Sequence, residues 1–339
     1  MAGPETLLDV ASSPDGASPL NVSFADNACL SAVVGEADAH LALIEQRLDV
    51  RLTPRGNVVA IAGDASAAEH ARDVLQELYM RASEGQEIGL GEVDGAIRMS
   101  AHTEELPLVA TNGEGRVEPP RGPRREIRTR KKTITARTPM QSEYMGLLEK
   151  HELVLATGPA GTGKTYLAVL YAVSLLEKGM IDRIILSRPA VEAGEKLGFL
   201  PGDMKEKVDP YLRPLYDALY DCMPPEQVER RLASGEIEIA PIAFMRGRTL
   251  ADSFIILDEA QNTTREQMKM FLTRFGQNSR MVVCGDPRQV DIPGGDGMSG
   301  LADAVAKLEG VEGFGTIRFT AADVVRHPIV GRIVEAYEG

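Results

Sequence analysis

The chain of 339 residues has no tryptophan, only 5% aromatic residues and three cysteines. No apolar run reaches the ~18–20 residues that a helix needs to cross a bilayer, so we expect no membrane partner. Residues 1–16 lack the basic and apolar stretches of a secretion signal. Cys29, Cys222 and Cys284 are far apart, and no Cys-x-x-Cys or histidine pair suggests a zinc site. These absences favour a reduced, cytoplasmic protein.

Basic residues are scarce in much of the chain, which has a formal net charge of -13. Residues 1–120 hold 20 acidic and 7 basic side chains, and no lysine. Residues 121–137 are the exception, with 8 basic and 1 acidic side chains. An acidic protein binds polyanions poorly, so this run is where we expect nucleic-acid phosphates to gather. A solvated tether between two domains is the alternative interpretation.

The first third of the chain predicts a small domain behind a disordered tail at residues 1–19. Residues 20–82 show the order β-α-β-β-α, an α+β unit that resembles a KH-type RNA-binding domain. A KH loop clamps RNA through Gly-x-x-Gly, but residues 35–38 read GEAD, with two acids and no second glycine. RNA binding and a protein-docking or structural role therefore both stay open for this domain.

A different pattern begins after residue 137. Residues 83–137 are rich in glycine and charge and predict a linker, with a short hairpin at 130–138 near its end. Beyond it, apolar runs such as ELVLAT and SFIILD alternate with helical patterns. These runs are apolar on both faces, as parallel strands covered by helices must be. Residues 138–339 are therefore predicted to form a three-layer α/β domain.

A phosphate-binding motif opens that domain. The stretch GPAGTGKT matches G-x-x-x-x-G-K-[ST] and lies between a predicted strand and a predicted helix, the context that the motif requires. Its glycines let backbone N–H groups turn toward phosphate oxygens, and the helix N-terminus adds a positive dipole end. Lys164 would reach the β- and γ-phosphates, and the Thr165 hydroxyl would bind Mg²⁺. The predicted nucleotide-binding residues of the loop are Gly158, Pro159, Ala160, Gly161, Thr162, Gly163, Lys164 and Thr165.

Carboxylates follow the next strand patterns. Asp258 and Glu259 emerge at the C-terminal end of FIIL, the edge at which open parallel sheets bind ligands. Asp258 suits the magnesium shell, and Glu259 can orient or deprotonate the water that attacks the γ-phosphate. An acid in this place favours attack of water on the γ-phosphate over transfer of that phosphate to a substrate, as in a kinase. Asp286 and Gln289 follow another strand, and the Gln289 amide could sense the γ-phosphate, with an ordinary turn as the alternative.

Together these stretches resemble the PhoH family of ATPases. The motifs that carry the resemblance are GPAGTGKT, SRPAVEAGEKLGFLPGD, DEAQN, GDPRQVDIP and DVVRHPIV. The second is the most specific, because phosphate-loop ATPases in general lack it. The resemblance covers residues 137–339 strongly and the N-terminal domain loosely. It implies a RecA-like P-loop NTPase core, similar to the first motor domain of superfamily 1 helicases, with ATP and Mg²⁺ as cofactors.

The resemblance also implies roles for single residues. Gln141 corresponds to a glutamine that reads adenine, and Arg188 and Pro189 fall in a stretch that faces nucleic acid. Arg326 corresponds to an arginine finger, which neutralises charge on the transferring phosphoryl group. A capping or surface position remains the alternative for Gln141, and an ordinary surface position remains the alternative for Arg188.

The family likeness leaves one motor domain where a superfamily 1 helicase has two. Either the protein binds and slowly hydrolyses ATP alone, or a neighbouring subunit supplies Arg326, which implies a homo-oligomer in the form of a hexameric ring. The predicted function is an ATP-hydrolysing motor or remodeller of single-stranded RNA in RNA metabolism. The alternative is a nucleotide-gated interaction protein that recruits an RNA-processing protein partner.

Overall fold

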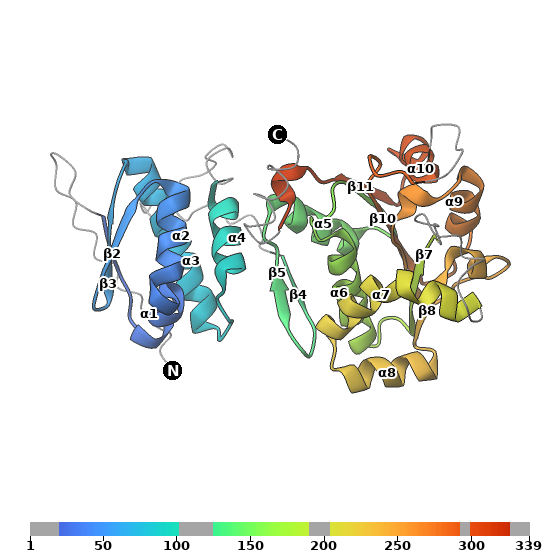
Figure 1. Cartoon of the computed structure of the whole chain (residues 1–339), viewed down its shortest axis with the longest axis horizontal. Helices are drawn as coiled ribbons and strands as arrows, with labels where there is room; N and C mark the ends of the chain where they lie inside the picture. Colours follow the sequence, from blue (N-terminus) through green and yellow to red (C-terminus); the bar gives the residue numbers. More distant parts are fainter. Residues whose placement is uncertain (1–19, 102–124, 190–203, 292–298, 326–339) are drawn as a thin grey trace, which may run out of the picture. The chain divides into compact units, whose positions relative to one another are not determined.

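The computed structural model describes residues 20–101, 125–189, 204–291 and 299–325. Contacts divide the chain into two units (Figure 1). The first consists of residues up to 124 together with 136–139, and the second of residues 125–135 and 140–339. No helix in the described ranges is long and apolar enough to span a membrane.

The first unit is an antiparallel sheet covered by helices. Its strands are β1 (Leu20–Ser23), β2 (Arg51–Arg55) and β3 (Val58–Ala62), in the order β1-β3-β2. Its helices are α1 (Asn27–Val34), α2 (Ala39–Leu48), α3 (Ala65–Ser83) and α4 (Leu90–Ala101). Alternate strand residues and the inner faces of all four helices share one apolar core. The unit is therefore α+β, as predicted.

Two helices of this unit were not predicted. The order β-α-β-β-α omitted α1, whose sequence NACLSAVV is too short and too uniformly apolar to show a helical period. It also omitted α4, because Gly91 and Gly95 lower helix propensity and gave the stretch the composition of a linker. Tertiary packing overrides that propensity, since Val93 and Ala96 of α4 are fully buried in the core.

The GEAD turn joins α1 to α2, which is the place where the KH-type resemblance puts the RNA-clamping loop. Gly35, Ala37 and Asp38 all have positive φ (78°, 52° and 60°), so the turn is tight. A Cβ at Gly35 would lie 2.6 Å from the His40 ring, which explains the glycine. The side chains of Glu36 and Asp38 are exposed, so the turn presents carboxylates to solvent.

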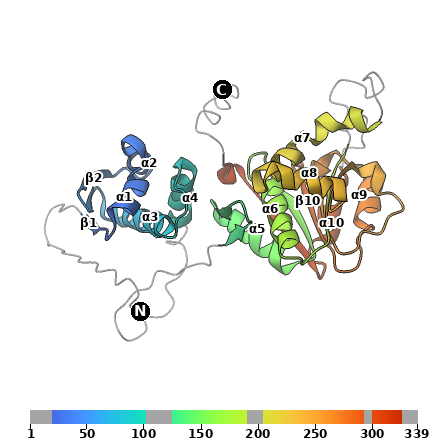
Figure 2. The same ribbon diagram turned by 90° about the horizontal axis from the view of Figure 1, so that it is seen from below.

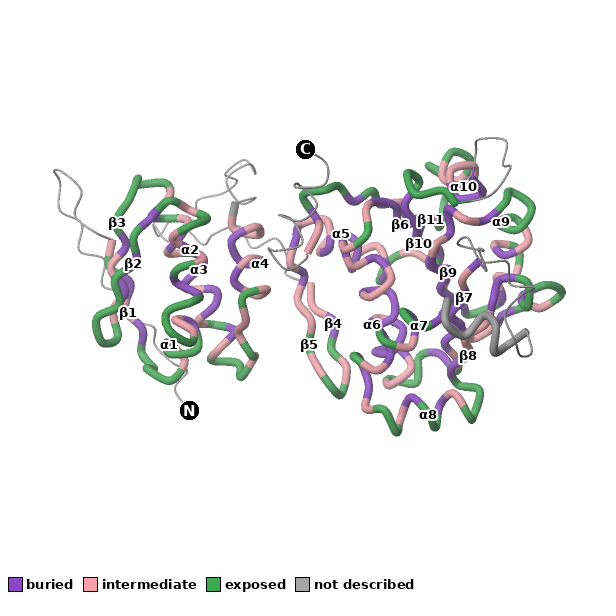
Figure 3. Tube along the Cα trace, in the orientation of Figure 1, coloured by how far each residue is buried: buried purple, intermediate pink, exposed green. Residues whose placement is uncertain are grey.

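The second unit contains the predicted parallel sheet. Its six strands lie in the order β11-β6-β10-β9-β7-β8 and are all parallel. They are β6 (Leu153–Thr157), β7 (Arg183–Arg188), β8 (Ile237–Pro241), β9 (Ser253–Leu257), β10 (Arg280–Gly285) and β11 (Phe314–Arg318). Most residues of the four central strands are buried (Figure 3), as expected of a sheet with both faces covered.

Helices cover both faces of this sheet (Figure 2). They are α5 (Pro139–Lys150), α6 (Lys164–Glu177), α7 (Met204–Cys222), α8 (Pro225–Ser234), α9 (Arg265–Leu272) and α10 (Gly300–Leu308). Helices α9 and α10 share an apolar core with alternate residues of β6, β7, β9 and β10. On the other face of the sheet, helix α6 packs against β7, β9 and β10. Helix α6 also contacts α7. The three-layer α/β prediction is confirmed.

The basic run is folded over residues 125–135, which excludes one of its two interpretations, the solvated tether. Strands β4 (Glu126–Arg128) and β5 (Thr133–Thr135) form a hairpin that belongs to the second unit. Lys131 Nζ donates to the Tyr220 carbonyl at 2.6 Å, and Lys132 forms an ion pair with Asp221. The run is therefore not a solvated tether over residues 125–135, and much of its charge has an internal partner.

Arg137 is held within the first unit. Its guanidinium forms an ion pair with Glu92 on α4. A Cβ at Gly91 would lie 2.9 Å from this guanidinium, and a Cβ at Gly95 would lie 3.2 Å from the Arg137 backbone. The two glycines that weaken α4 as a helix are thus the residues that allow Arg137 to approach it.

Candidate nucleotide-binding site

The phosphate loop lies between β6 and α6, at the carboxyl edge of the sheet. Gly158 has φ of 137°, and a Cβ there would lie 2.5 Å from the Phe319 carbonyl oxygen. Gly163 has φ of 86° and precedes the first residue of α6. The backbone path of the loop therefore depends on glycine at both positions.

Lys164 lies folded into the loop. Its Nζ donates to the carbonyls of Gly158 and Pro159 at 2.7 and 2.8 Å and to the Thr162 hydroxyl at 3.3 Å. Burial lowers the pKa of Lys164 from its ordinary value. The described partners of this ammonium are neutral oxygens, so the loop holds a positive charge that suits an anionic ligand.

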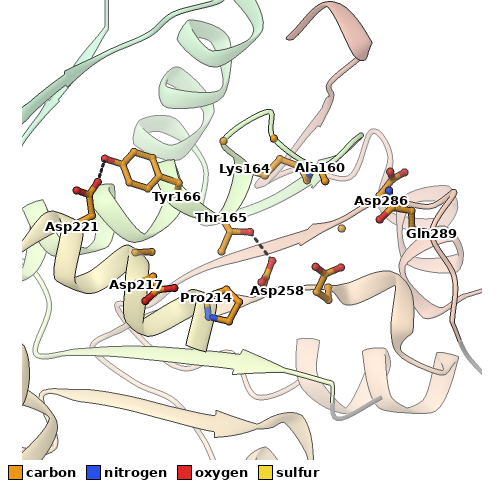
Figure 4. A pocket seen from close by; sticks show the side chains of 15 residues that line it. Ala160, Lys164, Thr165, Tyr166, Pro214, Asp217, Asp221, Asp258, Asp286 and Gln289 are labelled. Carbon is orange, nitrogen blue, oxygen red and sulfur yellow. Dashed lines mark hydrogen bonds between the residues drawn. The ribbon is translucent and has the colours of Figure 1, made fainter. Parts of the chain in front are cut away.

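Thr165 and Asp258, predicted as the magnesium ligands, are brought together. The Thr165 hydroxyl donates to Asp258 Oδ1 at 2.6 Å across the gap between α6 and the end of β9 (Figure 4). The Asp258 backbone N–H donates to the Ser187 carbonyl at 2.9 Å, which fixes the turn out of the strand. Burial raises the pKa of Asp258, and the Thr165 hydrogen bond opposes that shift.

Glu259 is held by two side chains that sequence reasoning did not connect with it. Arg188 Nη2 donates to Glu259 Oε1 at 3.2 Å, and Gln261 Nε2 donates to Glu259 Oε2 at 2.6 Å. Arg188 Nη1 also lies 3.9 Å from Asp258 Oδ2. Arg188, which was expected to face nucleic acid, thus contacts both carboxylates of the site. Glu259 itself has φ of 51°, a left-handed conformation that is unusual for a residue with a side chain.

Gln261 extends this network to the next strand. Its Oε1 accepts the backbone N–H of Asp286 at 3.0 Å, just after β10. A Cβ at Gly285 would lie 2.6 Å from this oxygen, so glycine there makes room for the amide. The Gln289 side chain is exposed and lies at the rim of the cavity, apart from this buried bond. Gln261 belongs to the DEAQN motif, but its role depends on the pairing of β9 with β10, which the motif does not show.

Gln141 approaches the loop from α5. Its side chain is 5% exposed and its amide donates to the Thr162 carbonyl at 3.0 Å. The alternative of a surface glutamine is therefore wrong, while the adenine role stays a prediction. Arg326 lies outside the described residues. The preceding Val325 donates its backbone N–H to the Gly161 carbonyl at 2.9 Å, against the phosphate loop.

A cavity of about 530 Å³ connects these elements, a size in the usual range for small-molecule sites (Figure 4). It contains five carboxylates and one lysine, so a triphosphate would be repelled unless a cation accompanied it. The residues present therefore fit a nucleotide with a divalent cation. The lining residues are Ala160, Gly161, Gly163, Lys164, Thr165, Tyr166, Pro214, Asp217, Ala218, Asp221, Asp258, Glu259, Gly285, Asp286 and Gln289.

The chain is similar to known proteins over most of its length. The family model described as PhoH, PhoH-like protein, matches residues 133–338. A PhoH-like protein of Bacillus subtilis (strain 168) is 47% identical over 307 residues, which cover 91% of this chain and 93% of that protein. Protein PhoH of Escherichia coli (strain K12) is 45% identical over 213 residues, 60% of this chain and 58% of that protein.

Among solved structures, the flagellar accessory protein FlaH from Methanocaldococcus jannaschii matches 49% of this chain and 71% of its own length. The sequence identity is 12% and the TM-score is 0.27, a likeness too slight to support a conclusion about this chain. The assignment of the fold therefore depends on the sheet order and on the phosphate loop described above.

Proposed function

Since the chain belongs to the PhoH family, we propose that it is a Mg²⁺-dependent ATPase that acts in RNA metabolism as a motor or remodeller of single-stranded RNA. The observation that carries the ATPase is the 2.6 Å hydrogen bond from Thr165 to Asp258 in front of the phosphate loop. Glu259 follows directly in the sequence, where it can act on water. A hydroxyl, a buried carboxylate and a neighbouring acid are the parts that nucleotide hydrolysis requires at this edge.

Binding of the triphosphate would change the bonds of the loop. Backbone N–H groups of the loop and of the first turn of α6 are placed to bind phosphate oxygens. Lys164 would leave the carbonyls of Gly158 and Pro159 to reach the phosphates. Thr165 and Asp258 would hold Mg²⁺, which supplies positive charge against the phosphates when it is bound. Gln141, beside the loop, would select adenine.

Hydrolysis would then depend on three further side chains. Glu259 would orient and deprotonate the attacking water, which requires it to turn away from Arg188. Gln289 would sense the γ-phosphate at the cavity rim. Arg326 of an adjacent subunit would complete the site, so the working form would be a hexameric ring.

One observation favours the second candidate function, a nucleotide-gated interaction protein that recruits an RNA-processing partner. In the described residues, carboxylates lie at both of the surfaces that were expected to attract RNA. The hairpin lysine Lys132 is paired with Asp221, and the GEAD turn presents Glu36 and Asp38. If the GEAD turn binds a macromolecule, a protein with basic residues suits it better than a phosphate backbone.

The ATPase rate measured with and without single-stranded RNA, at low and high salt, separates the two functions. A motor should be stimulated by RNA, and its RNA affinity should fall as salt rises. Lys164→Ala should abolish turnover, whereas Lys178→Ala, at an exposed position after α6, should not. Glu259→Gln should keep ATP bound and stall hydrolysis. Normal turnover by Glu259→Gln would show that this carboxylate does not act on water.

A further inference from the structure

Helix α7 forms one wall of the nucleotide cavity and brings two carboxylates to it. Asp217 and Asp221 both line the cavity, and they are four residues apart, so they lie on one face of the helix. Lys164 and Thr165 of the phosphate loop line the same cavity (Figure 4). A triphosphate bound at the loop would therefore be repelled by the α7 wall unless the negative charge of that wall were compensated.

A lysine of the β4–β5 hairpin compensates one of these carboxylates. Lys132, in the turn between the two strands, forms an ion pair with Asp221. Tyr166, which directly follows Thr165, donates from its hydroxyl to Asp221 Oδ2 at 2.7 Å (Figure 4). The Lys132 ammonium also lies 5.3 Å from the centroid of the Tyr166 ring, a cation–π distance. Side chains from the hairpin, from the first turn of α6 and from α7 thus meet at the cavity wall.

The hairpin is anchored to α7 by contacts that do not need the Lys132 ammonium. Lys131 Nζ donates to the Tyr220 carbonyl at 2.6 Å, and the Thr129 hydroxyl donates to the Cys222 carbonyl at 3.3 Å. Burial favours the neutral form of Asp221, but the bonds from Lys132 and Tyr166 outweigh it and lower the pKa of Asp221. Asp221 is therefore a charged group whose field in the cavity depends on the lysine beside it.

We propose that Lys132 sets the affinity of the site for nucleotide polyphosphates by neutralising Asp221 on the cavity wall. Lys132 does not line the cavity, so it acts through Asp221 and not by contact with the nucleotide. Without the ammonium, the carboxylate stays at the wall, held by Tyr166, and repels a triphosphate more than a diphosphate. The inference rests on the proposed nucleotide function and gives the hairpin of the basic run a part in that site.

Equilibrium binding of fluorescent ADP and of a fluorescent, non-hydrolysable ATP analogue, both with Mg²⁺, tests the inference, and thermal unfolding checks the fold of each variant. Lys132→Met should raise the Kd of the ATP analogue about three-fold or more and that of ADP by less, and added salt should reduce both effects. Adding Asp221→Asn to Lys132→Met should restore the Kd to within about two-fold of wild type, because an uncharged amide still accepts the Tyr166 hydroxyl. Lys150→Met removes an exposed lysine at the end of α5 and should leave the Kd unchanged.

The outcomes separate this inference from the function on which it rests. If wild type binds the ATP analogue and Lys132→Met binds it equally well, neutralisation of Asp221 does not set the affinity, although the ATPase proposal survives. If Lys132→Met weakens binding and Asp221→Asn does not restore it, Lys132 acts by holding the hairpin in place, and neutralisation is refuted. If the wild-type protein binds neither nucleotide at any salt concentration, the proposed function fails, and this inference fails with it.

Discussion

The contact between Arg188 and Glu259 predicts that Arg188 restrains ATP hydrolysis in the absence of RNA. Both oxygens of Glu259 accept hydrogen bonds, one from Arg188 at 3.2 Å and one from Gln261 at 2.6 Å. A carboxylate in this arrangement must change its orientation before it can accept a proton from water. RNA phosphates at the end of β7 would compete for Arg188 and release Glu259.

The size of the effect follows from the exposure of the pair. The Arg188 and Glu259 side chains are 21% and 36% exposed, so solvent screens their attraction. A pair of this kind contributes about 0.2–1 kcal/mol, and 1 kcal/mol corresponds to about five-fold in rate. Arg188→Met should therefore raise the RNA-independent ATPase rate by up to about five-fold and reduce the stimulation by RNA by the same factor.

Steady-state ATPase measurements with and without single-stranded RNA check this prediction. Arg183→Met is the matched control, because Arg183 lies at the opposite end of the same strand, away from the carboxylates. High salt should raise the wild-type basal rate toward that of Arg188→Met, since screening weakens the same ion pair. A basal rate ten-fold or more below wild type in Arg188→Met would refute restraint, and would show that Arg188 contributes to turnover.

Three further predictions concern the loop, the subunits and a thiol. Gly158→Ala should abolish ATP binding in calorimetry, because its Cβ would meet the Phe319 carbonyl oxygen at 2.5 Å; unchanged affinity would contradict the loop geometry. Mixtures of Lys164→Ala and Arg326→Ala subunits should regain ATPase activity, whereas mixtures no better than either variant argue against a shared site. Burial raises the pKa of Cys284 to about 12, so about one thiol in ten thousand is ionised at pH 8. Ellman's reagent should modify Cys284 only after unfolding, and rapid labelling of the native protein would show that the thiol is accessible.

The sequence was informative wherever the chemistry is local. A strand, a glycine-rich loop and a helix follow one another within 25 residues, so the pattern predicts both the elements and the place of Lys164. Asp258 could be assigned because four apolar residues lead into it and end at the edge of a parallel sheet. In both cases the evidence lies within one turn or one strand of the residue concerned.

Contacts that depend on strand order could not be predicted. Arg188 reaches Glu259 because β7 lies beside β9, and nothing in either segment shows that adjacency. The basic run was interpreted from its net charge alone, but the partner of Lys132 is Asp221, 89 residues later. Helix α4 was missed for a related reason, since Gly91 weakens the helix locally and is explained only by its approach to Arg137.

The left-handed backbone at Glu259 sets stability against activity at a single position. A side chain in that conformation costs about 1 kcal/mol or more relative to glycine, and the sharp turn it makes keeps the carboxylate beside Asp258. The substitution Glu259→Gly would relax the main chain and remove the acid on which turnover is proposed to depend. Glu259→Gly would also remove the hydrogen bonds from Arg188 and Gln261, so it would raise heat resistance only if the relief of the main chain outweighed them, and it would abolish hydrolysis in either case.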